Sequence, residues 1–246
     1  MARTSGTSSD SADNTDTSRP AVKEGGIRVS DILAGGLASA IAAVVGGTLG
    51  AVGSVVGQLA KLQGCRVVGF AGGKDKCDYV VKELGFDACI DHRQHNDLKS
   101  MSMALKEACP NGIDGNFENV GGMILDAILM RANAFSRVAM CGMISGYNGE
   151  PIPLAAPQLI LVNRMKVQGF IVSEHMQHWP AALAELGQGI ATGKYKHRET
   201  IANGLAAAPE AFMGLLKGKN FGKQLVKLVC MALPAPAGLA WSWTRF

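Results

Sequence analysis

The sequence predicts an α/β fold with a doubly wound parallel sheet, and three observations support this fold class. Short apolar segments alternate with amphipathic segments of about ten residues, which is typical of βαβ units. Glycine is abundant, with 31 residues in 246, whereas aromatic residues make up only 6%. The first apolar segment runs directly into a glycine-rich turn. Right-handed crossovers would bring the carboxyl ends of such strands together and place a ligand there.

The elements follow from apolar runs and from helix-stop signals. Gly64 and Gly85 each follow an amphipathic segment, as a glycine C-terminal to a helix does, and Pro110 ends another. We expect strands over residues 42–46, 66–70, 88–91, 115–119, 137–141, 167–172 and 223–228. We expect helices over residues 51–63, 76–84, 98–108, 124–132, 179–192 and 209–216.

The two ends of the chain differ in composition from the part between them. Residues 1–26 are rich in Ser, Thr and Asp and lack large apolar side chains, so we expect a disordered tail without a signal peptide. Residues 27–40 are expected to be a linker, 41–228 the folded domain, and 229–246 a C-terminal tail.

Composition also limits the partners and the compartment. The net charge of +4 is mild, and no basic run alternates with aromatic residues, so nucleic-acid binding is not expected. The six cysteines form no CxxC pair, which is typical of reduced thiols in a cytoplasmic protein. They are Cys65, Cys77, Cys89, Cys109, Cys141 and Cys230.

Residues 32–60 carry no charge, and this length would suffice to span a bilayer. Most of the run is Gly and Ala, which partition weakly into lipid. A buried strand, a glycine turn and a buried helix explain the same run, so we expect no membrane span, with an anchor as the alternative.

Gly47, Gly50 and Gly53 form a GxxGxxG pattern between the first strand and the first helix. This setting predicts a Rossmann-type dinucleotide site, because glycine permits a tight turn, close approach of a pyrophosphate, and close packing of helix on strand. The first N–H groups of the helix would then face the phosphates. The alternative is a glycine-rich turn without a ligand.

The second predicted strand ends in Ala71, Gly72 and Gly73, without the Asp or Glu that usually binds the ribose of NAD. Lys74 and Lys76 follow, and a cation beside small residues suits the 2′-phosphate of NADP. The alternative is that these lysines only begin a solvated helix.

Five stretches together resemble the zinc-independent medium-chain dehydrogenase/reductases, most closely the NADPH-dependent alkenal and 15-oxoprostaglandin 13-reductase group. This group includes leukotriene B4 dehydrogenases and curcumin reductases. The stretches are GAVGSVVGQLAK from Gly50, FENVGG from Phe117, CGMISGYN from Cys141, QGFIV from Gln168, and LLKGKNFGK from Leu215.

The resemblance implies a cofactor site for NADP(H), position by position. It assigns the pyrophosphate to Gly50, Ala51, Val52 and Gly53, and the 2′-phosphate to Lys76. His92 stands where the family usually has a tyrosine near the adenosine. Further cofactor contacts are implied for Asn119, Cys141, Gly142, Ile144, Ser145, Tyr147, Phe170, Ile171, Val172 and Asn220.

The resemblance also implies a reaction, in which the C=C bond of a small enone or alkenal accepts a hydride at its β-carbon. Negative charge then grows on the carbonyl oxygen, where a hydrogen-bond donor lowers the barrier. We expect Tyr147 to be that donor, the alternative being a tyrosine that packs its own loop.

The length of the chain modifies the expectation that it catalyses this reaction. Members of the family carry a GroES-like substrate domain before the cofactor domain, which the first 40 residues are too few to form. The alternative function is therefore a truncated, catalytically inactive NADP-binding relative.

The resemblance implies a homodimer. His92 with His95, and His175 with His178, lack neighbouring cysteines or carboxylates, so we expect no metal site.

Overall fold

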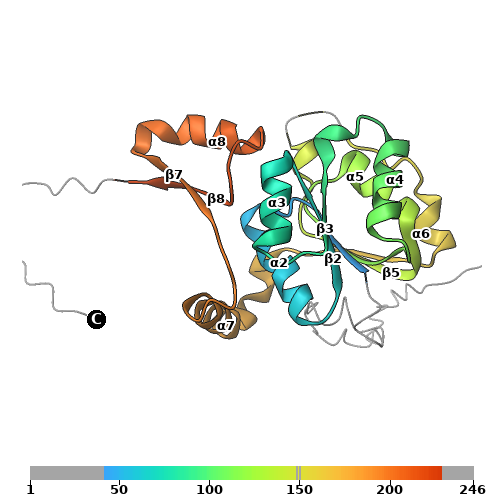
Figure 1. Cartoon of the computed structure of the whole chain (residues 1–246), viewed down its shortest axis with the longest axis horizontal. Helices are drawn as coiled ribbons and strands as arrows, with labels where there is room; N and C mark the ends of the chain where they lie inside the picture. Colours follow the sequence, from blue (N-terminus) through green and yellow to red (C-terminus); the bar gives the residue numbers. More distant parts are fainter. Residues whose placement is uncertain (1–41, 148, 150, 229–246) are drawn as a thin grey trace, which may run out of the picture.

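A six-stranded parallel sheet forms the centre of the computed structural model, which describes residues 42–147, 149 and 151–228 (Figure 1). The strand order is β3-β2-β1-β4-β5-β6. The predicted α/β fold with a parallel sheet is therefore confirmed. The tails predicted over residues 1–26 and 229–246, and the linker 27–40, lie outside the described residues. In the described part of the chain, no helix has the length and apolar character needed to cross a bilayer.

The strands lie where apolar runs predicted them, with shifts at their ends. They are β1 (Ala42–Val45), β2 (Arg66–Ala71), β3 (Ala88–Asp91), β4 (Ile113–Glu118), β5 (Ala132–Met140) and β6 (Lys166–Gly169). From β1 the chain continues to β2 and β3 on one side of the sheet, and it then crosses back to β4 on the other side of β1. The connections that leave β1 and β4 therefore run in opposite directions along the sheet. In an open α/β sheet, ligands bind at the carboxyl ends of the strands at this switch point.

Helices cover both faces of the sheet (Figure 1). They are α2 (Ala51–Leu62), α3 (Lys74–Lys82), α4 (Leu98–Ala108), α5 (Gly122–Arg131) and the short α6 (Gln158–Val162). One core packs α2 and α3 against the sheet through Ala60, Val80 and Leu84. A second core packs α4 and α5 against the opposite face through Leu105 and Ile128.

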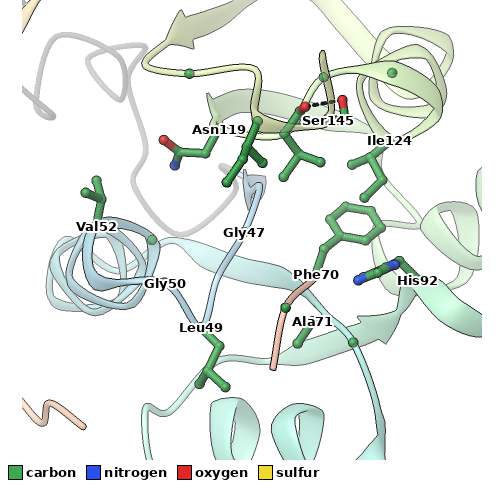
Figure 2. A pocket seen from close by; sticks show the side chains of 18 of the residues that line it. Gly47, Leu49, Gly50, Val52, Phe70, Ala71, His92, Asn119, Ile124 and Ser145 are labelled. Carbon is green, nitrogen blue, oxygen red and sulfur yellow. Dashed lines mark hydrogen bonds between the residues drawn. The ribbon is translucent and has the colours of Figure 1, made fainter. Parts of the chain in front are cut away.

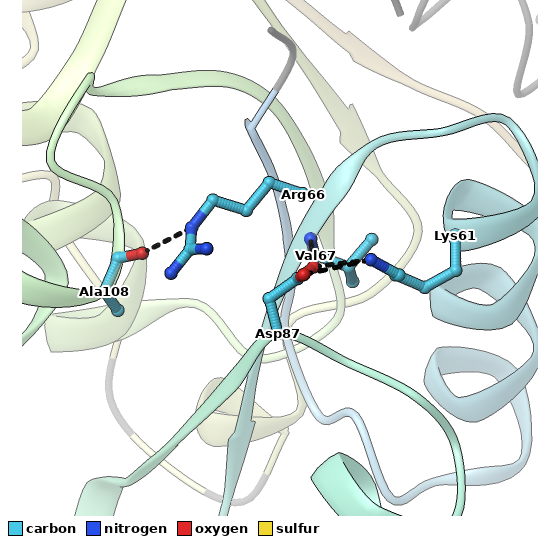
Figure 3. A network of polar contacts seen from close by, with 5 residues as sticks. All are labelled: Lys61, Arg66, Val67, Asp87 and Ala108. Atoms are coloured by element: carbon cyan, nitrogen blue, oxygen red, sulfur yellow. Dashed lines mark hydrogen bonds and ion pairs between the residues drawn. The ribbon is translucent and has the colours of Figure 1, made fainter. Parts of the chain in front are cut away.

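Polar contacts join the ends of α2 and α4 to the starts of β2 and β3 (Figure 3). Asp87 accepts from Lys61 Nζ at 2.8 Å and from the Val67 backbone N–H at 2.7 Å. Arg66 Nε donates to the Ala108 carbonyl at 2.9 Å. These contacts align α2, β2 and the start of β3, far from the carboxyl ends of the strands.

The last part of the chain forms a separate βαβ unit. After α7 (Trp179–Ala191), strands β7 (Glu199–Asn203) and β8 (Lys223–Lys227) pair in parallel and are connected by α8 (Ala208–Leu216). The predicted strand over residues 223–228 is therefore present as β8. Its partner β7 and the helix α6 were not predicted from the sequence, because both are short and mostly polar or exposed.

This unit contacts α2 and α3. The Gln58 side chain donates to the Lys196 carbonyl at 2.9 Å and accepts from the Lys196 N–H at 2.8 Å. The rings of Tyr79 and Phe221 meet edge to face, 5.3 Å between centroids. The loop that follows α8 is thereby held beside α3.

The strand predicted over residues 167–172 is wrong at its C-terminal end. β6 stops at Gly169, and the 3-10 helix η4 occupies Val172–His178. Pairing with β5 ends at Met140, so residues beyond Gly169 have no neighbouring strand to extend the ladder. The remaining 3-10 helices are η2 (His92–Gln94), η3 (Ile144–Gly146) and η5 (Leu205–Ala207).

Candidate functional site

A cavity of about 610 Å³ opens at the carboxyl ends of β1, β2, β4 and β5 (Figure 2). Figure 2 shows Gly50 and Val52 on one side, Asn119 and Ser145 on another, and His92 beside Phe70. Its size is that of a typical small-molecule site. Thirteen of the predicted site residues line it. They are Gly50, Ala51, Val52, Gly53, Lys76, His92, Asn119, Cys141, Gly142, Ile144, Ser145, Tyr147 and Asn220.

The glycine loop enters α2 with the geometry that the sequence predicts. Gly47 has φ +61°, a left-handed conformation that favours glycine. A Cβ on Gly53 would lie 2.6 Å from the Gly47 carbonyl oxygen, so only glycine lets the helix pack this close to the loop. No side chain caps α2 and its first turn has no acidic residue, which leaves the N–H groups of Ala51 and Val52 open to an anion.

Thr48 ties this loop to the second strand. Its hydroxyl donates to the Val45 carbonyl at 2.7 Å and accepts from the Phe70 N–H at 2.8 Å. The residue is fully buried, so both bonds form away from water. Sequence reasoning missed Thr48, although a threonine between two glycines of the turn was a visible signal.

Glu118 holds the opposite wall and was also missed. One oxygen of its fully buried carboxylate accepts from the N–H groups of Val120 and Gly121, at 2.6 and 2.8 Å. The other oxygen accepts from Asn116 Nδ2 at 2.9 Å. These bonds fix the loop that presents Asn119, whose amide donates to the Gly46 carbonyl at 3.3 Å. An acid at the last position of a strand, shortly before a glycine turn, was the available signal.

A second hollow of about 460 Å³ adjoins the first, lined by residues that include Gly72, Lys76, Arg93 and Lys219. Lys76 Nζ donates to the carbonyls of Gly218 and Asn220, both at 2.7 Å. Partial burial, and then the charge on Arg93, lower the pKa of Lys76. Lys76 and Arg93 thus share one hollow with Lys74 and Lys219, against the single acid Asp75, and this excess of positive charge is favourable for a phosphate.

Arg93 was not predicted from the sequence. Its Nε lies 2.8 Å from the point where a Cβ on Gly72 would sit, so the guanidinium lies over the glycines that follow β2. Its distance of 17 residues from Lys76 along the chain concealed this proximity.

Two of the charged groups beside this hollow have other partners. Lys74 pairs with Asp78 at 2.7 Å, and its side chain is 79% exposed. This pairing and exposure favour, for Lys74, the alternative of a solvated helix start, although Lys74 also borders the hollow. The Asp91 carboxylate accepts from the Gly73 N–H at 2.8 Å and supports the loop. Burial lowers the pKa of His92, which lines the first cavity.

Tyr147 lies on the exposed side of the cavity, with 64% of the residue accessible. Its hydroxyl oxygen accepts from the Met143 N–H at 3.2 Å, so the phenolic hydrogen is left to donate elsewhere. Ser145 in the same loop donates to the Val120 carbonyl, and Gly142 N–H donates to the Glu118 carbonyl at 3.0 Å. Burial raises the pKa of the neighbouring Cys141 thiol.

Three predicted site residues lie outside the cavity. Phe170 packs edge to face on Phe117, 6.0 Å between centroids. Ile171 and Val172 are 61% and 62% exposed and follow the end of β6. Their contact with a nicotinamide stays a prediction. Among the residues that the structure describes, no group of three or more His, Cys, Asp or Glu is arranged to hold a metal ion.

A glycine-rich helix N-terminus at the switch point of a parallel sheet defines the Rossmann class of α/β domain. Comparison with known proteins narrows this class. Residues 51–188 match the model of a family described as zinc-binding dehydrogenase. NADPH-dependent curcumin reductase from Escherichia coli is 43% identical over 192 residues, covering 75% of this chain and 54% of that protein.

Other relatives agree. The 2-alkenal reductase (NADP(+)-dependent) of Nicotiana tabacum is 43% identical, with 72% of this chain and 51% of that protein covered. The crystal structure of CurA from Vibrio vulnificus in complex with NADPH superposes with a TM-score of 0.70 at 42% identity, covering 77% and 57% of the two chains. The chain therefore belongs to the medium-chain dehydrogenase/reductase family, in its zinc-independent group of alkenal and prostaglandin reductases. It spans a little over half the length of these relatives.

Proposed function

We propose that the chain binds NADPH along the two adjoining hollows and reduces the C=C bond of small α,β-unsaturated aldehydes or ketones. The observation that carries the proposal is the pairing of an uncapped, acid-free helix N-terminus with a lysine and an arginine beyond β2. When bound, NADPH supplies the hydride that adds to the β-carbon of the substrate.

The pyrophosphate would lie against the first turn of α2. Its charge would be stabilised by the N–H groups of Ala51 and Val52 and by the helix dipole. The backbone at Gly50 and Gly53 carries no side chain that would keep the phosphates away.

The 2′-phosphate would lie between Lys76 and Arg93. Two carbonyls hold the ammonium group of Lys76, and its third N–H is left for the phosphate. The second strand ends in Ala71, without the carboxylate that usually selects the 2′-hydroxyl of NADH at this position.

Tyr147 would donate a hydrogen bond to the carbonyl oxygen of the substrate. The Tyr147 oxygen accepts from the Met143 N–H, so its hydrogen would be free to donate into the open side of the cavity. Negative charge on the carbonyl oxygen increases as the β-carbon accepts hydride, so this donor would stabilise the transition state more than the ground state.

The names of the relatives support this reaction, since they include NADPH-dependent curcumin reductase, prostaglandin reductase 1 and NADP-dependent 2-alkenal reductase. The individual substrate within the enone and alkenal class stays open. A homodimer and a cytoplasmic location remain predictions from the resemblance and from the cysteine pattern.

Two measurements on one sample test the proposed binding of NADPH and the proposed reduction of the C=C bond. NADPH and NADH are first titrated by the quenching of protein fluorescence, and NADPH oxidation is then followed with a series of small enones and alkenals. We expect tighter binding of NADPH than of NADH and turnover above the rate without protein. Binding without turnover would support the alternative of a catalytically inactive NADP-binding relative, and absence of binding would refute both.

A further inference from the structure

Two cysteine side chains meet at the junction of α3 and β3. Cys77 lies near the N-terminal end of α3 and Cys89 lies in β3, an edge strand of the sheet. Their sulfur atoms are 2.9 Å apart, and Cys89 donates its thiol hydrogen to Cys77. Both are free thiols on partly buried residues.

This geometry is close to that of a disulfide. An S–S bond is about 2.05 Å long and requires that the two Cβ–S vectors point toward each other. The two sulfurs are 2.9 Å apart, so bond formation needs an approach of under roughly 1 Å. Of the other cysteines in the described residues, Cys65 and Cys109 are buried in the core and Cys141 lines the cavity.

We propose that Cys77 and Cys89 form a redox-modification site, at which a hydroperoxide converts the two thiols into an intramolecular disulfide. The assignment rests on the contact between the sulfurs and does not depend on the proposed cofactor or substrate.

The chemistry balances with a hydroperoxide as the oxidant. The Cys77 thiolate attacks the outer peroxide oxygen, the O–O bond breaks, and Cys77 becomes a sulfenic acid while an alkoxide or hydroxide leaves. The Cys89 sulfur then attacks the Cys77 sulfur, the S–O bond breaks, and water leaves as the disulfide forms. Two thiols and one hydroperoxide thus give one disulfide, one alcohol or water molecule, and one further water.

The surroundings of the two thiols indicate which one attacks the peroxide and which one resolves the sulfenic acid. The hydrogen bond from Cys89 lowers the pKa of Cys77, against opposing effects of burial and of the Asp91 carboxylate. The same hydrogen bond and burial raise the pKa of Cys89. Cys77 is therefore the better thiolate for the first step, and Cys89 resolves the sulfenic acid.

Peptide mapping of the full chain tests the proposal. The protein is treated with hydrogen peroxide, alkylated with iodoacetamide under denaturing, non-reducing conditions, and digested with trypsin. Cleavage after Lys76, Lys82 and Arg93 places the two cysteines on separate peptides. We expect a loss of two alkylatable thiols and one linked species, lighter than the sum of the two reduced peptides by two hydrogen atoms, that dithiothreitol separates.

Variants give a second readout. In Cys89→Ser the Cys77 sulfenic acid has no resolving thiol, so dimedone should label Cys77 there and not in the wild type. Cys141→Ser, which removes another partly buried thiol, should leave the 77–89 link unchanged. The proposal would be overturned if peroxide oxidised Cys141 while Cys77 and Cys89 were still recovered as separate, alkylated peptides. A link from Cys77 to another cysteine or to a second chain would do the same.

Discussion

Lys76 carries most of the proposed preference for NADPH, because a charge held by two carbonyls in a partly buried hollow cannot turn away into solvent. Replacing Lys76 with Ala removes that cation. Hydrogen bonds to charged groups contribute about 1.5–3 kcal/mol, so the Kd of NADPH should rise by about tenfold to hundredfold. Fluorescence titration should find the Kd of NADH nearly unchanged.

The matched control is Lys74→Ala, which removes a lysine two positions away that pairs with Asp78 at the surface. It should leave the ratio of NADPH to NADH affinity as it is in the wild type. An unaltered ratio in Lys76→Ala would refute the assignment of that lysine.

Tyr147 is the second residue on which the proposal depends. Tyr147→Phe keeps the ring and removes the donor, so kcat with an enone should fall by about 10²–10³-fold while the Kd of NADPH stays within a factor of about two. Steady-state kinetics and titration on one preparation separate the two effects. A parallel loss of cofactor affinity would indicate that Tyr147 mainly contacts the cofactor or supports its own loop, and would contradict its role as the donor to the substrate.

At the scale of elements, the glycine loop and α2 act together, because their close approach positions the N–H groups of the first turn. Gly53→Ala would place a Cβ 2.6 Å from the Gly47 carbonyl oxygen and force the helix away from the loop. We expect a loss of about 1–3 kcal/mol in the free energy of unfolding, as for overpacked cores, together with weaker NADPH binding. Urea unfolding and cofactor titration measure the two.

Gly187→Ala in α7 is the control for this substitution, because a Cβ at that position meets no atom within 4 Å. A glycine inside a helix costs about 0.5–1 kcal/mol relative to alanine, so this variant should be slightly more stable. Equal effects of the two substitutions would show that the contact with the loop is not what requires glycine at position 53.

At the scale of the whole molecule, a bound cofactor should stabilise the fold, because its site joins loops from four strands and the segment after α8. At a concentration 100 times Kd, a ligand adds about 2.7 kcal/mol to the free energy of unfolding. For a chain of this size that corresponds to a rise in Tm of about 5–10 °C. Thermal scans should show this rise with NADPH and a smaller one with NADH at the same concentration.

The sequence predicted the sheet, the glycine loop and half of the residues that line the cavity. Strand 88–91 and helix 98–108 agree with the structure at both ends, because their limits are set by local signals such as the aspartate that caps α4. β5 begins five residues earlier than predicted, at Ala132, where pairing with Ile113 of β4 extends it across an irregularity in the ladder. The sequence of a single strand does not show how far its pairing with a neighbouring strand extends.

What the sequence determined by itself was local. Apolar periodicity and the glycines at positions 47, 50 and 53 specify a strand, a turn and a helix, because backbone conformation depends mainly on neighbouring residues. Tertiary structure decided the contacts between distant segments. It brought Arg93 beside Lys76, tied Lys76 to the carbonyl of Gly218, and set Cys77 against Cys89. These depend on how elements pack across a sheet, and single-chain periodicity carries no information about that packing.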